Sequence, residues 1–312
     1  MNRSPRVAVI ISTRNRGDRI TATIRGILAS DYTDFTLMVV DQSDNGTTEQ
    51  AVRSFRNSSR IQYVRSTTEG LSIGRNVGIN STKSELIAIT DDDCEVPAQW
   101  LRRLVAALAD DQRIGLVFGS VLPAAHDPTM GFIPSRVCRA HTVARSIYEK
   151  HRIQGMGACM GMRRSVWERL GGFDPTFGAG ALFRAAEETD LTLRALLAGY
   201  SVCDTPEVAV VHHGFYGWGE RRGLVDGYWY GTGAAFGKNF RYHPPPIAYL
   251  LCGLAFRWLL DRPGVASSLG SRPHRLLQLT SFCRGFIAGT LAVVDPGRRH
   301  EADGRVRREP TS

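Results

Sequence analysis

A chain of 312 residues, 43% of them apolar, has enough core-forming material for one large domain or two smaller ones, which excludes a disordered protein. The net charge of +9 is uneven, because residues 241–312 hold eleven Arg, no Lys and five acidic residues and so contribute +6. No recognition-helix, zinc-finger or RNP-like motif accompanies this charge. We therefore expect no nucleic-acid partner and favour an anionic membrane surface.

The cysteines and the N-terminal residues bear on the compartment. Six cysteines are scattered along the chain without a CxxC pair or a zinc-like Cys/His spacing. Residues 1–6 lead into a strand and lack the apolar core of a signal peptide. We expect reduced thiols and a cytoplasmic protein, peripheral at the inner face of the cell membrane.

Strands and helices are expected to alternate through the first 121 residues. Short apolar runs predict strands at 6–11, 35–40, 61–64, 85–90 and 115–121. Three helices are expected between these strands. The first has an apolar stripe at Ile20, Ile24, Ile27 and Leu28, and the second covers about residues 47–55. The third starts at Pro97 and has an apolar face at Leu101, Leu104, Val105 and Leu108. This alternation is typical of an α/β fold with a mostly parallel sheet covered by helices on both faces.

The pattern is less regular after residue 121. Residues 122–154 have no clear periodicity, and we interpret them as a mobile substrate loop. Ser165 and Glu168 match a capping box at a helix start. A helix is expected from Glu187 to Gly199, and a last strand at Val208–Val211 ends on two histidines.

A domain boundary is predicted near residue 240, which separates an α/β domain (1–240) from a C-terminal apolar and basic helical segment (241–312). The apolar stretches Ile247–Leu260 and Leu276–Val294 contain Arg257 and Arg284, so neither is a clean transmembrane span. Interfacial helices at a membrane and helices packed on the α/β domain both fit this pattern. From about residue 296 we expect a disordered charged tail.

Three consecutive acids, Asp91, Asp92 and Asp93, follow the predicted strand at 85–90. This places them at the carboxyl edge of the sheet, where open α/β sheets bind ligands. Because adjacent carboxylates repel one another, a divalent cation such as Mg²⁺ or Mn²⁺ bridging a diphosphate fits them. The alternative is that one Asp caps the next helix while the others are solvated.

Several motifs occur together in an order that resembles the family 2 glycosyltransferases, inverting enzymes with a GT-A fold. The resemblance covers about residues 6–215 and is carried by Val9–Asn15, Val39–Ser43, Gly74–Gly78, Asp91–Asp93 with Trp100 and Leu101, Arg163–Arg164 with Gly171–Asp174, and Glu187–Leu191. It implies metal-dependent transfer of a sugar from a UDP-, GDP- or dTDP-linked donor to a hydroxyl of a glycan or lipid-linked acceptor. Such a reaction belongs to cell-envelope or exopolysaccharide synthesis.

The resemblance also implies roles on the donor side. Thr13 with Arg14 in its loop, and Asp41 at the end of the second strand, are expected in the nucleotide pocket. Arg75 is expected to steady the diphosphate or the ribose. Asp91 is expected on the ribose and metal side and Asp93 on the metal, with Asp92 sharing either task. Taken alone, Asp41 is more readily interpreted as a turn-capping residue.

The catalytic base is expected among the acids that open the predicted helix at 187. Glu188 aligns with the catalytic acid of the family, but the usual Glu-Asp pair is replaced here by Glu187-Glu188, so Glu187 and Asp190 stay alternatives. One of His212 and His213 is expected to complete the metal shell. Because neighbouring strand residues point to opposite faces, only one can do so, and we favour His212.

Two other functions remain open on the sequence. In a metal-dependent phosphohydrolase, Asp91 or Asp93 would be the nucleophile, although the triplet follows three earlier strands rather than the first. A catalytically degenerate GT-A protein would bind a nucleotide sugar as a scaffold without turnover, and the departure at Glu188 keeps this hypothesis open. Retention of all three acids argues against it.

Overall fold

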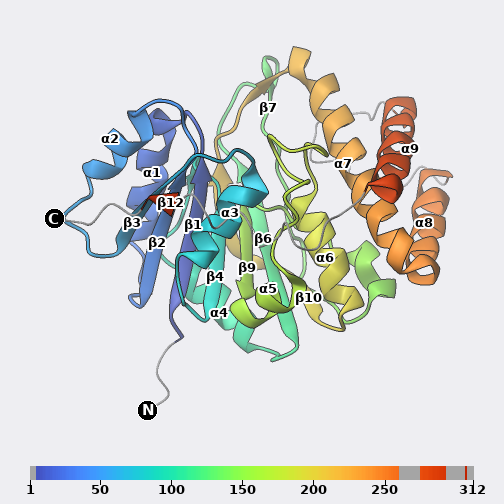
Figure 1. Ribbon diagram of the computed structural model, residues 1–312, viewed down its shortest axis with the longest axis horizontal. Coiled ribbons are helices and arrows are strands. Elements are labelled where there is room, and N and C mark those ends of the chain that lie inside the picture. Colours follow the sequence, from blue (N-terminus) through green and yellow to red (C-terminus); the bar gives the residue numbers. More distant parts are fainter. Residues whose placement is uncertain (1–4, 260–274, 293–305, 308–312) are drawn as a thin grey trace.

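The computed structural model describes residues 5–259, 275–292 and 306–307, and within these ranges ten strands form one central sheet (Figure 1). The sheet contains β1 (Val7–Thr13), β2 (Phe35–Asp41), β3 (Ile61–Ser66), β4 (Leu86–Thr90), β5 (Cys94–Glu95), β6 (Ile114–Pro123), β8 (Thr142–Ala144), β9 (Cys159–Arg163), β10 (Ser201–His212) and β12 (Val306–Arg307). Its order is β12-β3-β2-β1-β4-β9-β6-β10-β5, with β8 paired to β10.

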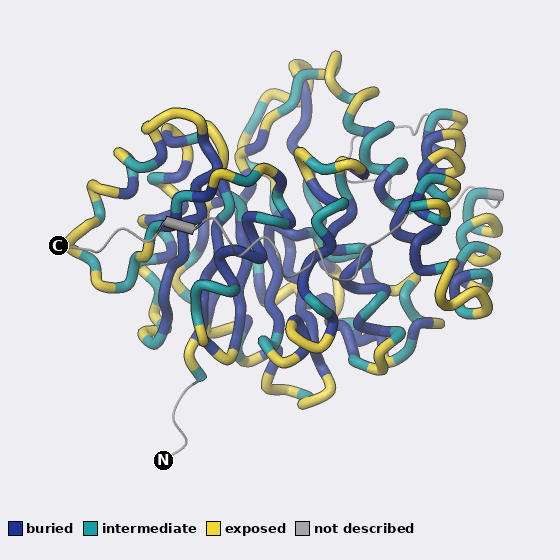
Figure 2. Tube along the Cα trace, viewed as in Figure 1, coloured by how far each residue is buried: buried dark blue, intermediate teal, exposed yellow. Residues whose placement is uncertain are grey.

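The sheet is mostly parallel, which confirms the predicted fold class. β3, β2, β1 and β4 are parallel neighbours, and β6 is parallel to β10. β9 lies antiparallel between β4 and β6 and joins the two parallel groups. The central strands are mostly apolar because helices bury both of their faces, and Figure 2 shows them as the buried centre of the molecule.

Helices pack on the two faces of the sheet according to the alternation of side chains in the strands. The helices around it are α1 (Gly17–Leu28), α2 (Thr47–Arg53), α3 (Leu71–Asn80), α4 (Trp100–Ala109), α5 (Arg164–Leu170) and α6 (Glu187–Leu197). In β1, Val7, Val9 and Ile11 belong to the core under α1 and α4. Ala8 and Ile10 belong to the opposite core, under α3, α5 and α6.

Three further helices extend the second of these cores: α7 (Arg221–Tyr242), α8 (Pro244–Leu259) and α9 (Arg275–Leu291). Glycines let α9 approach α7 closely, since a side chain at Gly233 or Gly237 would collide with the backbone of α9, and one at Gly285 or Gly289 with that of α7. The inner faces of α8 and α9 therefore pack on the core of the α/β part, which was one of our two interpretations of this segment. The expected boundary at 240 lies near the end of α7. No helix in the described ranges is both long and apolar enough to cross a membrane.

Local expectations differ from the structure in two places, and a third lies mostly outside the described residues. The capping box is wrong, because α5 begins at Arg164 directly after β9 and has no side-chain cap, which leaves Ser165 inside the first turn. Residues 122–154 contain β7 (Gly131–Phe132), β8 and a 3₁₀ helix, η1 (Ile147–Arg152). β8 is held by pairing to β10, while β7 pairs with β11 (Tyr216–Gly217). The expected tail from about 296 falls outside the described residues except at β12, which pairs with β3.

Candidate functional site

An open cleft of about 580 Å³ lies at the carboxyl ends of β1 and β4. Nine of the predicted site residues line it together: Thr13, Arg14, Arg75, Asp91, Asp92, Asp93, Glu187, Glu188 and His212. Asp41, Asp190 and His213 do not line it. Most of the predicted donor, metal and base residues thus share one space although they come from distant parts of the chain.

The acidic triplet is held by side chains from neighbouring elements. Thr13 Oγ1 donates to Asp92 Oδ2 at 2.5 Å, because β1 and β4 are parallel neighbours and end side by side. Arg16 Nη1 lies 3.1 Å from Asp92 Oδ1 and 3.2 Å from Asp93 Oδ2. Arg75 Nη2 lies 3.2 Å from Asp91 Oδ1. Guanidinium groups on two sides therefore offset the repulsion that we expected a cation to offset.

The three carboxyl groups differ in their affinity for protons. Burial raises the pKa of Asp92 to about 6, against the hydrogen bond from Thr13. Burial also raises the pKa of Asp91, partly offset by Arg75. Burial opposes ionisation of Asp93 too, but the His212 imidazole and Arg16 outweigh it and hold its pKa below the ordinary value. Asp93 is therefore the member of the triplet that stays ionised most readily.

His212 reaches the site because β10 pairs antiparallel with β5, which opposes His212 to Cys94, the residue after the triplet. His212 Nε2 lies 3.3 Å from Asp93 Oδ1, and its Nδ1 lies 3.0 Å from the carbonyl oxygen of Pro134. Burial disfavours the charged imidazole, but the neighbouring Asp93 carboxylate raises the pKa of His212 above its usual value. The alternation along the strand turns His213 away, with Nε2 at 3.6 Å from Glu95 Oε2.

Arg75 is a buried link across the cleft floor. It comes from α3, is 1% exposed, and binds both Asp91 and Glu187, whose Oε1 lies 2.9 Å from Arg75 Nη1. Gly157 permits this position, since a Cβ there would come within 2.9 Å of both Nη atoms. Arg75 thus ties the triplet after β4 to the first residue of α6.

Glu188 is buried at the cleft wall on the first turn of α6. Burial, followed by the adjacent Glu187 carboxylate, raises the pKa of Glu188 well above its usual value. The chain enters α6 through two non-glycine residues with left-handed backbone, Arg184 (φ 65°) and Ala186 (φ 70°). Such conformations persist when surrounding structure imposes them, and they occur often at functional sites.

Asp190 and Asp41, in contrast, are satisfied by protein partners. Asp190 Oδ1 accepts from Lys238 at 2.8 Å and Asn239 at 3.1 Å, while Oδ2 accepts from Arg194 at 2.8 Å. Asp41 is fully buried and accepts from the Ser43 amide, the Tyr63 hydroxyl and Arg65. Neither residue lines the cleft, and protein donors bind both carboxylates, so their contacts in this structure are those of structural residues.

The site offers a partial donor set for a metal ion. Asp93 Oδ1 is buried without an aligned hydrogen bond and faces His212, and this pair of oxygen and imidazole ligands suits Mn²⁺. In the described part of the chain, no group of three or more His, Cys, Asp or Glu side chains is arranged to hold a metal. Asp91 instead faces Arg75. A cation at this place would need further ligands besides Asp93 and His212.

Three cleft residues were not singled out from the sequence. Arg16 follows Thr13 in the loop after β1. Its position in a basic loop at the sheet edge could have indicated from the sequence that it lies beside the acidic triplet. Met156 and Tyr228 line the cleft beside Glu188 but come from a loop and from α7. Nothing in the local pattern around these two residues indicates their position, because only the packing of α7 brings them there.

Comparison with known proteins gives a consistent result. The family model described as glycosyl transferase family 2 matches residues 8–171. The probable glycosyltransferase YdaM of Bacillus subtilis is 25% identical over 215 residues, which cover 65% of this chain and 49% of that protein. The chain spans about a quarter to a half of the length of the first curated relatives it matches.

Two solved structures share the fold. The mannosyltransferase PcManGT from Pyrobaculum calidifontis, in complex with GDP-Man and Mn²⁺, has a TM-score of 0.62 and 22% identity, covering 97% of this chain and 80% of that one. S. aureus TarS in complex with UDP-GlcNAc has a TM-score of 0.54 and 16% identity, covering 74% and 66%. At these identities the likeness concerns the fold.

Proposed function

Because this chain belongs to glycosyl transferase family 2, we propose that it is an inverting glycosyltransferase whose cleft binds a nucleotide-sugar donor. One observation carries the proposal: the acidic triplet, His212, Arg75 and Glu188 all line a single cleft at the carboxyl edge of the sheet. A donor site and a candidate base therefore face the same volume, as transfer from a bound donor to a hydroxyl requires. The donor is a UDP-, GDP- or dTDP-linked sugar.

On the donor side, the residues at the ends of β1 and β4 bind the nucleoside diphosphate. Thr13 and Arg14 border the nucleotide, and Asp91 and Asp92 lie towards its ribose and phosphates. Arg75, already held by Asp91 and Glu187, keeps a positive charge under the diphosphate. A charge that is fixed before binding stabilises a developing anion without reorganisation.

Asp93 and His212 would hold a divalent cation, Mg²⁺ or Mn²⁺, with Asp91 next to them. When bound, such a cation supplies positive charge to the diphosphate leaving group. The protein contributes the ligands: Asp93 keeps its carboxylate ionised beside His212, and the Pro134 carbonyl orients the imidazole through Nδ1.

For the transfer step we assign the base to Glu188. Its carboxylate takes the proton of the acceptor hydroxyl while the acceptor oxygen bonds to the anomeric carbon, and the bond from that carbon to the diphosphate breaks on the opposite face. The nucleoside diphosphate leaves with the bonding electron pair. Glu187 is engaged by Arg75 and Asp190 by Lys238, Arg194 and Asn239, so Glu188 is the acid of the three without a charged partner at hydrogen-bond distance.

We further propose that the acceptor is a glycan or lipid-linked hydroxyl in cell-envelope or exopolysaccharide synthesis, and that the enzyme works at the inner face of the membrane. Large apolar side chains are exposed on α8 and α9, namely Tyr249, Phe256, Leu276, Leu279, Ile287 and Leu291. Apolar side chains beside basic residues suit an anionic interface. Failure of the full chain to float with anionic liposomes at low salt would contradict this assignment.

Calorimetry with UDP, GDP and dTDP, each with and without Mn²⁺, tests the donor site. We expect one nucleotide to bind in a metal-dependent manner, and Glu188→Gln to keep that binding while transfer falls about 10²-fold or more. Product analysis by NMR then gives the anomeric configuration. Binding of a nucleotide sugar without any release of nucleoside diphosphate would favour the scaffold hypothesis, and full activity of Glu188→Gln would overturn the assignment of the base.

A further inference from the structure

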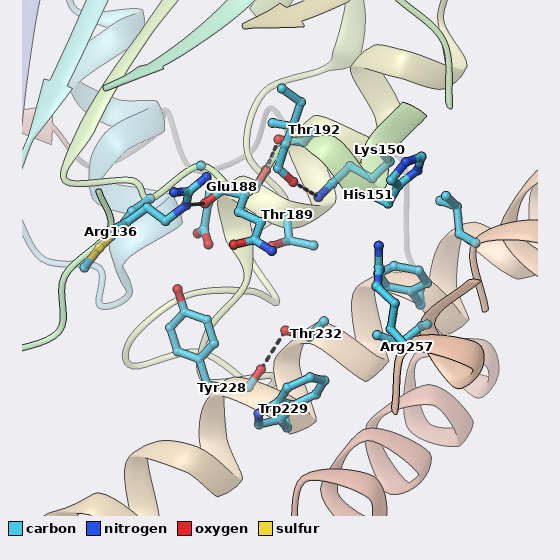
Figure 3. Close-up of a pocket in the computed structure, with 17 residues that line it drawn as sticks. Arg136, Lys150, His151, Glu188, Thr189, Thr192, Tyr228, Trp229, Thr232 and Arg257 are labelled. Carbon is cyan, nitrogen blue, oxygen red and sulfur yellow. Dashed lines mark hydrogen bonds between the residues drawn. The ribbon is translucent and has the colours of Figure 1, made fainter. Parts of the chain in front are cut away.

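A second, smaller pocket of about 110 Å³ lies behind Glu188 (Figure 3). It shares Met156, Glu188 and Tyr228 with the donor cleft, so these three side chains border both spaces. The remaining lining comes from η1 and the residues around it, from α6, and from α7 and α8. A group in this pocket therefore lies against the same glutamate that borders the donor.

The pocket gathers positive charge. Arg136, Lys150 and Arg257 line it, and Glu188 is the single carboxylate of its lining. The charge of Arg136 is compensated by an ion pair, because its Nη2 lies 3.0 Å from Asp204 Oδ2. Lys150 Nζ donates to the carbonyl oxygen of Ile153 at 3.0 Å, which leaves its charge without a paired carboxylate within the described chain.

Arg257, from the opposite side of the pocket, also has no carboxylate partner among the described residues, and burial lowers its pKa. Figure 3 shows Arg257 and Tyr228 projecting from α8 and α7 into the space that Lys150 borders on the other side. Burial also lowers the pKa of Lys150 to about 8, against the carboxylates of Asp204 and Glu188, which raise it. Two partly buried cations that face one space are stabilised by an anion between them.

The other walls are apolar and aromatic, formed by Ile153, Trp229, Phe236, Leu250 and Leu254. Such walls suit the ring face or the aliphatic part of a ligand rather than a free inorganic ion alone. The hydroxyls of Tyr228, Thr189 and Thr232 add neutral hydrogen-bonding groups. The lining as a whole matches a glycosidic ligand with one anionic substituent.

We propose that this pocket is the acceptor site and that Lys150 and Arg257 recognise an anionic group, a phosphate or a carboxylate, on the acceptor. The inference rests on the proposed transferase function, since it takes Glu188 as the base. The anion binds in the pocket, and the acceptor hydroxyl meets Glu188 where the pocket adjoins the donor cleft. The selectivity for charged acceptors then comes from η1 and α8 rather than from the donor cleft.

Two measurements test this assignment separately from the function. Calorimetry with inorganic phosphate and with glucuronate, in the presence of the bound nucleotide and Mn²⁺, tests the pocket without turnover. Transfer assays with octyl glucoside, octyl glucuronide and octyl glucose 6-phosphate test it as an acceptor site. The two charged glycosides distinguish a carboxylate from a phosphate. The variants are Lys150→Gln, Arg257→Gln and their combination, with Arg257→Lys as the conservative change and the exposed Arg56→Gln as a control of equal charge.

We expect wild type and Arg56→Gln to bind at least one of the anions and to prefer the matching charged acceptor over the neutral one. The double variant should lose the anion binding and about tenfold or more in kcat/KM for that acceptor, with transfer to octyl glucoside and nucleotide binding within twofold of wild type. Arg257→Lys should recover part of the loss.

Three results would overturn the inference. One is wild type that binds nucleotide but neither anion. Another is an equal loss on charged and neutral acceptors in the double variant. The third is anion binding by a protein that binds no nucleotide, because the proposed function then fails while the pocket remains an anion site without an acceptor role.

Discussion

Arg75 Nη1 lies 2.9 Å from Glu187 Oε1, and this buried ion pair joins α3 to the start of α6 across the floor of the cleft. The second terminal nitrogen of the same guanidinium faces Asp91 at 3.2 Å. One side chain therefore sets the distance between the acidic triplet and the helix that carries Glu188. The planar fork of Arg suits this double contact, which the single ammonium of Lys cannot reproduce.

Replacing Arg75 should therefore disturb both stability and binding. We expect Arg75→Gln to lower the free energy of unfolding by about 3 kcal/mol, because Glu187 and Asp91 lose the cation that compensates them in a buried place. Urea unfolding measures this loss. Arg75→Lys keeps the charge and should recover only part of the stability. Unchanged stability in Arg75→Gln would show that the ion pair contributes nothing to the fold.

The rate of transfer should depend on the protonation of Glu188. Its pKa is raised by burial and by the Glu187 carboxylate, and the base must be ionised, so kcat/KM should rise with pH through a value above that of an ordinary glutamate. Glu187→Gln removes the neighbouring charge and leaves Arg75 to attract Glu188. The acidic limb of the pH profile should then move to lower pH. A limb that does not move in Glu187→Gln would contradict the coupling.

Asp190 should matter for stability rather than for the proton transfer. Burial opposes its ionisation, but Arg194 and Lys238 outweigh burial and hold its pKa at about 2. Because the folded pKa lies below the unfolded one of roughly 3.9, this stabilisation is present above pH 4 and is lost as the pH falls through about 2. It amounts to about 2 to 3 kcal/mol.

Asp190→Asn should remove this part of the acid sensitivity and lower stability at pH 7. Thermal unfolding between pH 2 and pH 7 measures both effects. The same variant, assayed below its unfolding temperature, should keep the pH profile of transfer. A profile that lost its acidic limb in Asp190→Asn would instead make Asp190 the base.

Metal removal and the two histidines form a matched test. We expect EDTA, Asp93→Ala and His212→Ala each to abolish metal-dependent nucleotide binding, since Asp93 and His212 provide the facing ligands. His213→Ala is the control, because its ring points away to Glu95 and is half exposed. Calorimetry with Mn²⁺ and nucleotide measures binding after EDTA treatment and in each of the three variants. If His213→Ala loses binding as His212→Ala does, the assignment of the histidine is wrong.

Much of the α/β part was accessible from local patterns. The strands at 35–40 and 85–90 and the helix with Ile20, Ile24 and Ile27 are confirmed, because a buried strand or an amphipathic helix needs its own apolar pattern wherever it packs. The capping box at Ser165 failed because β9 runs directly into α5, and that continuity depends on strand pairing.

The candidate site divides in the same way. Sequence order alone placed the triplet after a buried strand, and the alternation of strand residues indicated that only one of His212 and His213 could face the site. The structure places His212 beside Asp93 and His213 beside Glu95. The sequence could not separate Glu188 from Asp190, since both lie on the first turn of one helix. Lys238 and Asn239, which engage Asp190, come from α7 and reach it only through packing.

The sequence by itself thus determined the alternation of strands and helices, the family and the acids available for the chemistry, because these depend on the order and spacing of neighbouring residues. The tertiary structure decided that Asp190 lies outside the cleft, which histidine meets Asp93, and that Lys150 and Arg257 share a pocket behind Glu188. These are contacts between residues far apart in the chain, and their energies depend on burial and on partners that no local pattern contains.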